Sequence, residues 1–488
     1  MKKLNLNFLF IAFVLLAGQS IRANVKLASV FSDNMVLQAD KTIVVWGTAD
    51  VAELVTVEIN GFKAISRTTI NGKWTVELPA MKYGGPYELK VSGDDIVVLK
   101  NVMIGEVWLC AGQSNMHMKV KGVVNAQEEI AHANYKNIRF LTIPKSGSTV
   151  PQNTVNASWE VCSLQSIASK TAVGYFFGRE LNTELNVAIG LIDVSYGGAT
   201  IFTFMDESTV ANTIGTAIIH SKDKEYETFC TKQVMQWEEN GRMGKRPSLL
   251  VQGISTLCYN AMVNPIVPFA NRGAIWYQGE SNAAEPQKYV TWFGDYISMM
   301  RTKFNNREMP FYFVQLAGFE NQHNTNIPSE TWAKFRLGQE RCLKHPNTGM
   351  AAAMDIGMKD NIHPKNKQEV GRRLALNALN QTYGKTDVVY QGPQLKFIKK
   401  KGKTLVLTFD HCEGGLKNKD KGKIIKGFSA VLTNGEIIAI EGKIKSKNTI
   451  EIKGSTIKRL RYAYANYPVC PLYNSEGLPA LPFDQLVE

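Results

Sequence analysis

Between residues 102 and 385, apolar strand-like runs alternate with longer amphipathic helical patterns, and this alternation limits the possible folds more than any other feature of the chain. Parallel strands need long crossover connections, which helices usually supply, so the alternation predicts a mostly parallel sheet with helices on both faces. We expect strands at 102–110, 187–194, 273–277, 310–316 and 350–355. We expect helices at 172–185, 286–304, 329–343 and 364–383. Functional groups in this architecture gather at the carboxyl ends of the strands.

The segments on either side of this region show period-two hydrophobicity and turn residues instead. Before it, β-like runs lie at 42–46, 54–59 and 74–78, with Asn60-Gly61 and Asn71-Gly72 as hairpin turns. After it, similar runs lie at 404–409 and 431–440, with Asn434-Gly435 as a turn. A chain of 488 residues can bury more than one core. We therefore expect an α/β domain at 102–385, flanked by sandwich-like β domains at 24–101 and 386–488.

The first 23 residues have the pattern of an export signal. Lys2 and Lys3 precede an apolar run at 8–17, and small or polar residues follow as far as Ala23. The run is too short to span a bilayer, and no later stretch reaches the roughly 18 apolar residues that a membrane helix needs. The sequence therefore predicts a cleaved leader and an exported protein, periplasmic or extracellular, without a membrane span.

The cysteines and the charge both limit the possible ligands. Seven cysteines are scattered, without a Cys-x-x-Cys pair, so we expect most of them to be buried apolar side chains and we expect no metal. The net charge of +13 is concentrated at 396–461, which holds 15 Lys and 2 Arg against 6 acidic residues. Such a lysine-rich β surface is usually a solvated face that discourages strand pairing between molecules. The alternative is binding of an anionic glycan. No nucleic-acid partner is predicted, because aromatic residues do not interleave with these charges.

A candidate nucleophile stands directly after the first strand of the α/β region. The apolar run 105–111 leads into Gly112-Gln113-Ser114-Asn115. A serine nucleophile needs an exposed hydroxyl, a neighbouring backbone N–H for the oxyanion and small neighbours that let an ester approach. The end of a strand supplies all three. By itself such a tetrapeptide also occurs in ordinary turns, so the prediction depends on finding a base.

His363 is the best candidate for that base. It lies in Asp360-Asn361-Ile362-His363-Pro364, between the strand at 350–355 and the helix at 364–383. One loop could therefore present both the imidazole and an orienting carboxylate at the carboxyl edge of the sheet. The alternative explanation is that Asp360 and Pro364 cap the helix. His117, three residues after Ser114, is the rival base.

Two further segments could stabilise an oxyanion. Trp276-Tyr277-Gln278-Gly279-Glu280-Ser281-Asn282 ends an apolar strand and offers the Gln278 amide. Tyr196-Gly197-Gly198-Ala199 follows another strand, and its glycines permit close backbone approach. An ordinary tight turn is the alternative explanation for the two glycines.

Together these segments resemble the sialate O-acetylesterase family of SGNH hydrolases. The resemblance rests on Gly-Gln-Ser-Asn-Met at 112–116, Trp-Tyr-Gln-Gly-Glu-Ser-Asn at 276–282 and Asn-Ile-His-Pro-Lys-Asn-Lys at 361–367, and it extends to the segments 30–38 and 473–480. It implies an SGNH-type αβα sandwich and a serine esterase without a cofactor. Ser114 would be the nucleophile, His363 the base and Asp360 the orienting acid. Ser114 N–H, Gly198 N–H and the Gln278 side chain would hold the oxyanion.

The sequence departs from the broader pattern at two of these positions. The superfamily usually has Asn where Gln278 stands. Some relatives carry the acid two residues before the histidine, whereas Asp360 stands three residues before it, so Asp355 is kept as the alternative acid. The resemblance implies an O-acetylated glycan as the substrate, with 9-O-acetyl sialic acid the first expectation and acetyl xylan or another polysaccharide the alternative. A non-catalytic carbohydrate-binding protein is the alternative of another class. A sialate carboxylate would call for an arginine, and the α/β region offers Arg179, Arg272, Arg336 and Arg341. No oligomeric state is predicted.

Overall fold

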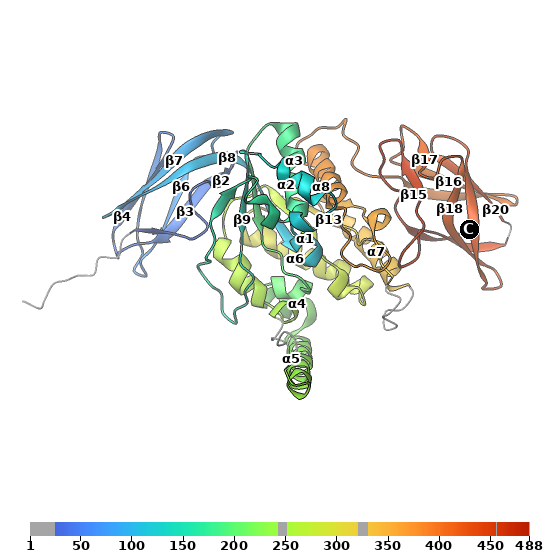
Figure 1. Ribbon diagram of the computed structural model, residues 1–488, viewed down its shortest axis with the longest axis horizontal. Helices are drawn as coiled ribbons and strands as arrows, with labels where there is room; N and C mark the ends of the chain where they lie inside the picture. Colours follow the sequence, from blue (N-terminus) through green and yellow to red (C-terminus); the bar gives the residue numbers. More distant parts are fainter. Residues whose placement is uncertain (1–24, 243–250, 321–329, 455, 488) are drawn as a thin grey trace, which may run out of the picture.

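The computed structural model describes residues 25–242, 251–320, 330–454 and 456–487. Figure 1 shows an elongated molecule with an α/β body in the middle and a β domain at each end. The predicted leader at 1–23 lies outside the described residues. No helix in the described part of the chain is long and apolar enough to cross a membrane.

The central body is built on a mostly parallel sheet whose strand order is β10-β9-β11-β8-β12-β13-β14. Neighbouring strands from β9 to β14 along this order run parallel, and β10 alone is antiparallel to its neighbour β9. The bounds are β8 Ile96–Gly112, β9 Ile138–Thr142, β10 Trp159–Val161, β11 Ile189–Asp193, β12 Gly273–Tyr277, β13 Phe311–Val314 and β14 Thr348–Ala351. The predicted mostly parallel sheet is therefore confirmed, with β9 and β10 as additional strands.

Helices cover both faces of this sheet, because alternate side chains of a strand point to opposite faces. Phe311 and Phe313 of β13 pack edge-on against Phe293 of α6 on one face. Tyr312, which lies between them, points to the other face, where its hydroxyl shares a hydrogen bond of 2.7 Å with the Thr382 hydroxyl at the end of α8. The helices are α3 Ala172–Leu185, α6 Pro286–Lys303, α7 Thr331–Arg341 and α8 Lys367–Gln381. The αβα sandwich expected from the sequence is confirmed.

Two helix features differ from the expectation. Helix α8 begins at Lys367 rather than at Pro364, because the Asn366 side chain accepts a hydrogen bond from Glu369 N–H and caps the helix there. Pro364 and His363 are thereby left in the loop. The sequence also missed α4 Glu207–Ile214 and α5 Thr216–Glu239. Helix α5 projects from the body (Figure 1), so it needs no continuous apolar stripe of the kind that marks a packed helix.

The N-terminal β domain shares a strand with the body. Strand β8 pairs with β7 Gly84–Ser92 over its first half and with β11 and β12 over its second half, so it crosses the predicted boundary at residue 102 without a break. The turn between β4 Leu54–Ile59 and β5 Phe62–Arg67 is Asn60-Gly61, as predicted, and both residues have positive φ values of 47° and 80°. The remaining strands are β1 Lys26–Leu27, β2 Val36–Gln38, β3 Ile43–Thr48 and β6 Lys73–Leu78.

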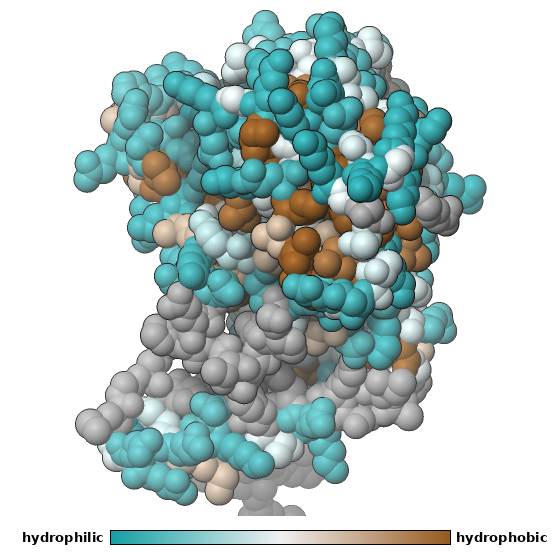
Figure 2. Space-filling view, turned by 90° about the vertical axis from the view of Figure 1, so that its right-hand side faces the viewer, coloured by the Kyte–Doolittle hydropathy of each residue, from teal (hydrophilic) through white to brown (hydrophobic). Residues whose placement is uncertain are grey.

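The C-terminal β domain is an antiparallel sheet of order β15-β16-β20-β19-β18-β21-β23, accompanied by the pair β17-β22. Its alternating pattern is clear in β16, where Leu405, Leu407 and Phe409 are buried. Figure 2 shows the end of the molecule that carries this domain, where hydrophobic residues are interspersed among many hydrophilic ones. The bounds are β15 Gln394–Lys401, β16 Thr404–Asp410, β17 Leu416–Asn418, β18 Ile424–Leu432, β19 Ile437–Ile444, β20 Thr449–Lys453, β21 Ile457–Tyr462, β22 Leu472–Asn474 and β23 Phe483–Leu486.

The cysteines behave as small apolar residues. Six have described side chains, all six are free thiols, and five of them are buried; Cys470 is partly exposed. The side chain of Cys230 lies outside the described part.

Candidate active site

Ser114 stands at the carboxyl end of β8, as the first residue of the four-residue helix α1 Ser114–His117. The strand must turn sharply at Gly112, whose φ is 132° and where a Cβ atom would lie 2.2 Å from the Tyr277 carbonyl oxygen. The buried Gln113 side chain then accepts N–H bonds from Gly279 and Ser281, both at 3.3 Å. These contacts fix the turn, and the Ser114 side chain remains partly exposed.

His363 faces the Ser114 hydroxyl from the loop between β14 and α8. Its Nε2 atom lies 2.8 Å from Ser114 Oγ, within the reach that a general base needs. Asn361 holds the loop by accepting the His363 N–H at 2.9 Å. Burial, and then the charge of Lys367, lower the pKa of His363 below its ordinary value. A lowered pKa keeps the imidazole neutral near pH 7, so that it can accept the serine proton.

Neither predicted acid contacts this histidine. Asp360 is exposed, and within the described residues it makes no hydrogen bond or ion pair with His363. Asp355 is bound in two places by Arg373, at 2.6 and 2.8 Å, and accepts the Tyr473 hydroxyl at 2.9 Å. Its oxygens are therefore used to join the body to the C-terminal domain. The structure brings Ser114 and His363 together, and no acidic side chain among the described residues is hydrogen-bonded to this histidine.

The Gln278 side chain does not occupy the predicted oxyanion position. It is fully buried, and its Nε2 donates to the Ala199 carbonyl at 3.1 Å and to Asn282 Oδ1 at 2.6 Å. Its Oε1 accepts the Tyr289 hydroxyl at 2.9 Å. Both amide protons of Gln278 are therefore used in hydrogen bonds inside the protein, and one of these bonds holds the loop that contains Ala199. The prediction for Gln278 is corrected on this ground.

The glycine loop does lie beside the nucleophile. A Cβ atom at Gly197 would be 3.6 Å from Ser114 Cβ, so the backbone passes directly against the serine. Gly198 follows with a φ of 75°, and its carbonyl accepts the Ser281 hydroxyl at 3.0 Å. Its N–H has no acceptor among the described residues. Ser114 N–H at the start of α1 and Gly198 N–H are thus the two backbone donors available for an oxyanion.

A buried polar cluster joins the nucleophile turn to the histidine loop, and the sequence did not assign it a role. Lys367 Nζ donates to Asn115 Oδ1 at 2.6 Å, and Asn115 Nδ2 donates to Glu280 Oε1 at 2.6 Å and to the Ile362 carbonyl at 3.0 Å. Burial lowers the pKa of Lys367 to about 7 and raises the pKa of Glu280. Asn115, Glu280 and Lys367 each belong to a different one of the three motif segments. Only their contacts in the structure reveal that they form one cluster.

The rival base His117 faces a different serine. Its Nδ1 lies 3.4 Å from the hydroxyl of Ser195, which donates to Asp193 at 2.5 Å. Burial, and then the charge of Lys119, lower the pKa of His117 to about 4. His117 makes no hydrogen bond to Ser114 within the described part of the chain, so it does not replace His363.

Of the four candidate arginines, Arg179 and Arg272 are paired with carboxylates and Arg336 is bonded to backbone carbonyls, whereas the exposed Arg341 donates to a glutamine side chain. Their partners are Glu129 for Arg179, Glu106 for Arg272, the carbonyls of Ala465 and Asn466 for Arg336, and Gln287 for Arg341.

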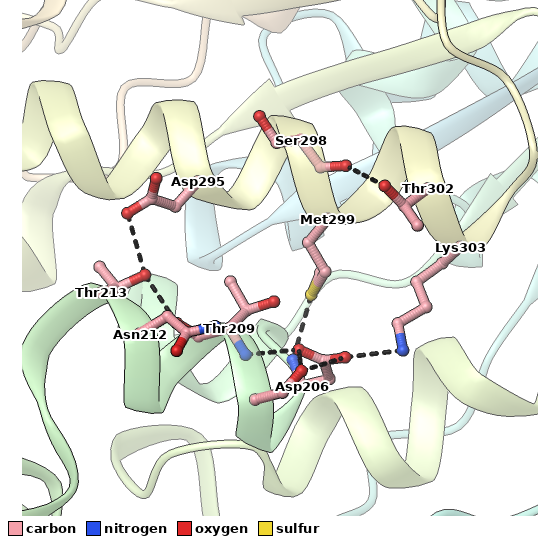
Figure 3. A pocket seen from close by; sticks show the side chains of 10 residues that line it. Asp206, Thr209, Asn212, Thr213, Asp295, Ser298, Met299, Thr302 and Lys303 are labelled. Carbon is pink, nitrogen blue, oxygen red and sulfur yellow. Dashed lines mark hydrogen bonds and ion pairs between the residues drawn. The ribbon is translucent and has the colours of Figure 1, made fainter.

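A separate polar pocket of about 390 Å³ lies between α4 and α6 (Figure 3). Its charged residues also pair with one another or with neighbours, Asp206 with Lys303 at 2.6 Å and Asp295 with Thr213 at 2.9 Å. It contains none of the predicted site residues.

A serine and a neutral imidazole at the carboxyl edge of an SGNH-type αβα sheet, with backbone donors beside them, define a serine ester hydrolase. Residues 104–380 match the family described as carbohydrate esterase, sialic acid-specific acetylesterase. The chain is 31% identical to the mouse sialate O-acetylesterase over 76% of each chain, and 28% identical to the human one over 97% of this chain and 95% of the human protein. A solved structure of a carbohydrate acetylesterase from Xanthomonas citri shares 30% identity and a TM-score of 0.83, over 95% of this chain and all of that one.

The chain belongs to the sialic acid-specific acetylesterase family of carbohydrate esterases. It is a carboxylic ester hydrolase, as the resemblance implied. This membership, together with the paired Ser114 and His363, leaves the non-catalytic alternative without support.

Proposed function

We propose that this protein removes O-acetyl groups from sialic acid, preferentially at the 9-position, with Ser114 as nucleophile and His363 as general base and acid. The observation that carries the proposal is the 2.8 Å contact between His363 Nε2 and Ser114 Oγ beside the glycine loop. The sialate O-acetylesterases that share about 29% identity over most of the chain support the choice of sugar.

In the first half of the reaction Ser114 Oγ attacks the acetyl carbonyl carbon and His363 Nε2 takes the serine proton. The oxyanion that forms accepts hydrogen bonds from Ser114 N–H and Gly198 N–H. The bond between the carbonyl carbon and the sugar oxygen then breaks, and His363 gives the proton to that oxygen. The products of this half are the free sugar hydroxyl and an acetyl ester on Ser114.

In the second half a water molecule attacks the acetyl ester while His363 takes a proton from the water. The bond to Ser114 Oγ breaks, the serine regains its proton from His363, and acetate leaves. We assign no orienting role to Asp360, because its exposed carboxylate makes no hydrogen bond to the imidazole among the described residues. The buried cluster of Asn115, Glu280 and Lys367 holds the histidine loop in its place.

The substrate is tested by acetate release from 9-O-acetyl sialic acid and from acetylated xylan, with wild type and Ser114→Ala side by side. We expect wild type to act faster on the sialic acid and Ser114→Ala to act on neither. Faster release from xylan would favour the polysaccharide alternative and leave the serine mechanism intact. Release by Ser114→Ala at the wild-type rate would contradict the mechanism itself.

We also propose that the protein is exported with removal of its leader. The basic and apolar pattern of residues 2–17 supports this. N-terminal sequencing of the protein made in a secreting host should show a start near residue 21 or 24. A retained Met1 in the exported fraction would contradict it.

A further inference from the structure

The loop after β9 brings a lysine to the same edge of the sheet as the nucleophile. Lys145 follows β9, and β11 lies between β9 and β8, with all three strands parallel. Neighbouring strands are about 4.8 Å apart, so the end of β9 lies about 10 Å from the end of β8. His363 follows β14, on the other side of β8 in the strand order. Lys145 and His363 therefore approach Ser114 from opposite sides.

The side chain of Lys145 points toward the nucleophile's neighbours. Its Nζ lies 5.4 Å from the centre of the Tyr196 ring, in a cation–π contact. Tyr196 immediately precedes Gly197, where a Cβ atom would be 3.6 Å from Ser114 Cβ. Lys145 thus stands on the rim of the site, next to the glycine loop that supplies an oxyanion donor.

Lys145 forms no ion pair in the described part of the chain, although Lys119 and Asp193 lie near enough to act on its charge. Lys119, its cationic neighbour, is paired with the buried Asp193 at 3.0 Å. His117 is neutral near pH 7, because burial lowers its pKa to about 4. Lys145 is exposed and has no carboxylate partner among the described residues. A surface cation without an ion-pair partner, beside a catalytic pair, is available to an anionic group of the substrate.

We propose that Lys145 binds the carboxylate of an acidic O-acetylated sugar whose acetyl group lies at Ser114, and so selects sialic acids over neutral sugars. This inference rests on the proposed function and names the residue that gives it specificity. In a 9-O-acetylated sialic acid the carboxylate and the acetyl group lie at opposite ends of the sugar. Lys145 and Ser114 likewise follow two different strands, β9 and β8, with β11 between them. Tyr196 follows β11, the strand between β9 and β8, and its ring would offer a surface to the sugar's apolar face.

The inference is tested with Lys145→Met and, as a matched control, Lys136→Met, which changes another exposed lysine of the same domain. Three substrates are compared: 9-O-acetyl sialic acid, the same compound with its carboxylate converted to a carboxamide, and p-nitrophenyl acetate. We expect Lys145→Met to raise KM for the carboxylate substrate about tenfold, the size of a charge-assisted contact, with kcat little changed. We expect the carboxamide to be a tenfold poorer substrate for wild type but not for Lys145→Met.

The p-nitrophenyl acetate rate separates this outcome from damage to the fold, since that ester has no carboxylate. Equal loss on all three substrates, or no change on the carboxylate substrate while wild type cleaves it, would overturn the role of Lys145 alone. Failure of wild type on both sialic acid compounds, with p-nitrophenyl acetate still cleaved, would overturn the role of Lys145 together with the proposed substrate. The esterase assignment would stand in that case.

Discussion

The histidine loop at 357–366 and the segment at 276–282 both follow strands of the central sheet, and both looked like suppliers of catalytic groups. The histidine loop presents His363 to Ser114 at 2.8 Å. The other segment instead holds the site together: its Gln278 amide is fully bonded inside the protein, and Gly279 and Ser281 donate to Gln113. The difference shows that a polar residue at a strand end can act on a substrate only if its hydrogen-bonding atoms are left unused by the fold.

The largest effect should come from the residues that contact the reacting atoms. Ser114→Ala and His363→Ala are each expected to lower kcat for p-nitrophenyl acetate by about 10⁴-fold or more, and the double variant should lose little further activity. Steady-state rates test this prediction, and thermal unfolding of each variant controls for loss of folded protein. Additive losses in the double variant would mean that the two residues do not act as one unit.

Gln278→Leu tests the other half of the comparison. It would remove the hydrogen bonds that Gln278 makes with the Ala199 carbonyl, Asn282 Oδ1 and the Tyr289 hydroxyl, so the free energy of unfolding should fall by about 1–3 kcal/mol. The folded fraction should keep kcat within about tenfold of wild type. A loss of about 10²–10³ in kcat at unchanged stability would instead restore Gln278 as an oxyanion donor.

The variant Lys367→Met tests whether the buried cluster of Asn115, Glu280 and Lys367 affects the pKa of His363. The charge of Lys367 lowers the pKa of His363, and the Lys367 pKa of about 7 leaves it protonated at the acidic pH where the histidine titrates. Removing that charge should raise the pKa of His363. Since only the neutral imidazole accepts the serine proton, the acidic limb of kcat/KM should move to higher pH. A lower rate with an unmoved pH profile would indicate that Lys367 only supports the loop.

Asp360→Asn should have the smallest effect, with kcat within about twofold of wild type, because an orienting acid would instead cost about 10⁴-fold. Asp355→Asn is the matched control. It weakens a buried ion pair with Arg373, so it should reduce the free energy of unfolding by about 3–5 kcal/mol. A collapse of kcat in Asp360→Asn would show that its carboxylate reaches the histidine during turnover.

Much of the architecture could be predicted because it depends on local periodicity. Helix Ala172–Leu185 and strand Gly273–Tyr277 have the predicted bounds, since the apolar pattern that packs them is continuous in the sequence. Strand β9 and helix α5 were missed. The short β9 is interrupted by Arg139, and α5 projects from the body, so neither has a strong apolar pattern.

The sequence by itself determined the α/β body between two β regions and the positions of Ser114, His363 and the glycine loop at one edge of the sheet. These follow from strand order and local pattern, because parallel strands end at the same edge. Only the tertiary structure decided that Asp360 is exposed, that Gln278 is used inside the protein, that Lys367 acts on His363 and that Lys145 lies over the Tyr196 ring. Which polar atoms are already bonded depends on residues far apart in the chain, and no local pattern encodes those partners.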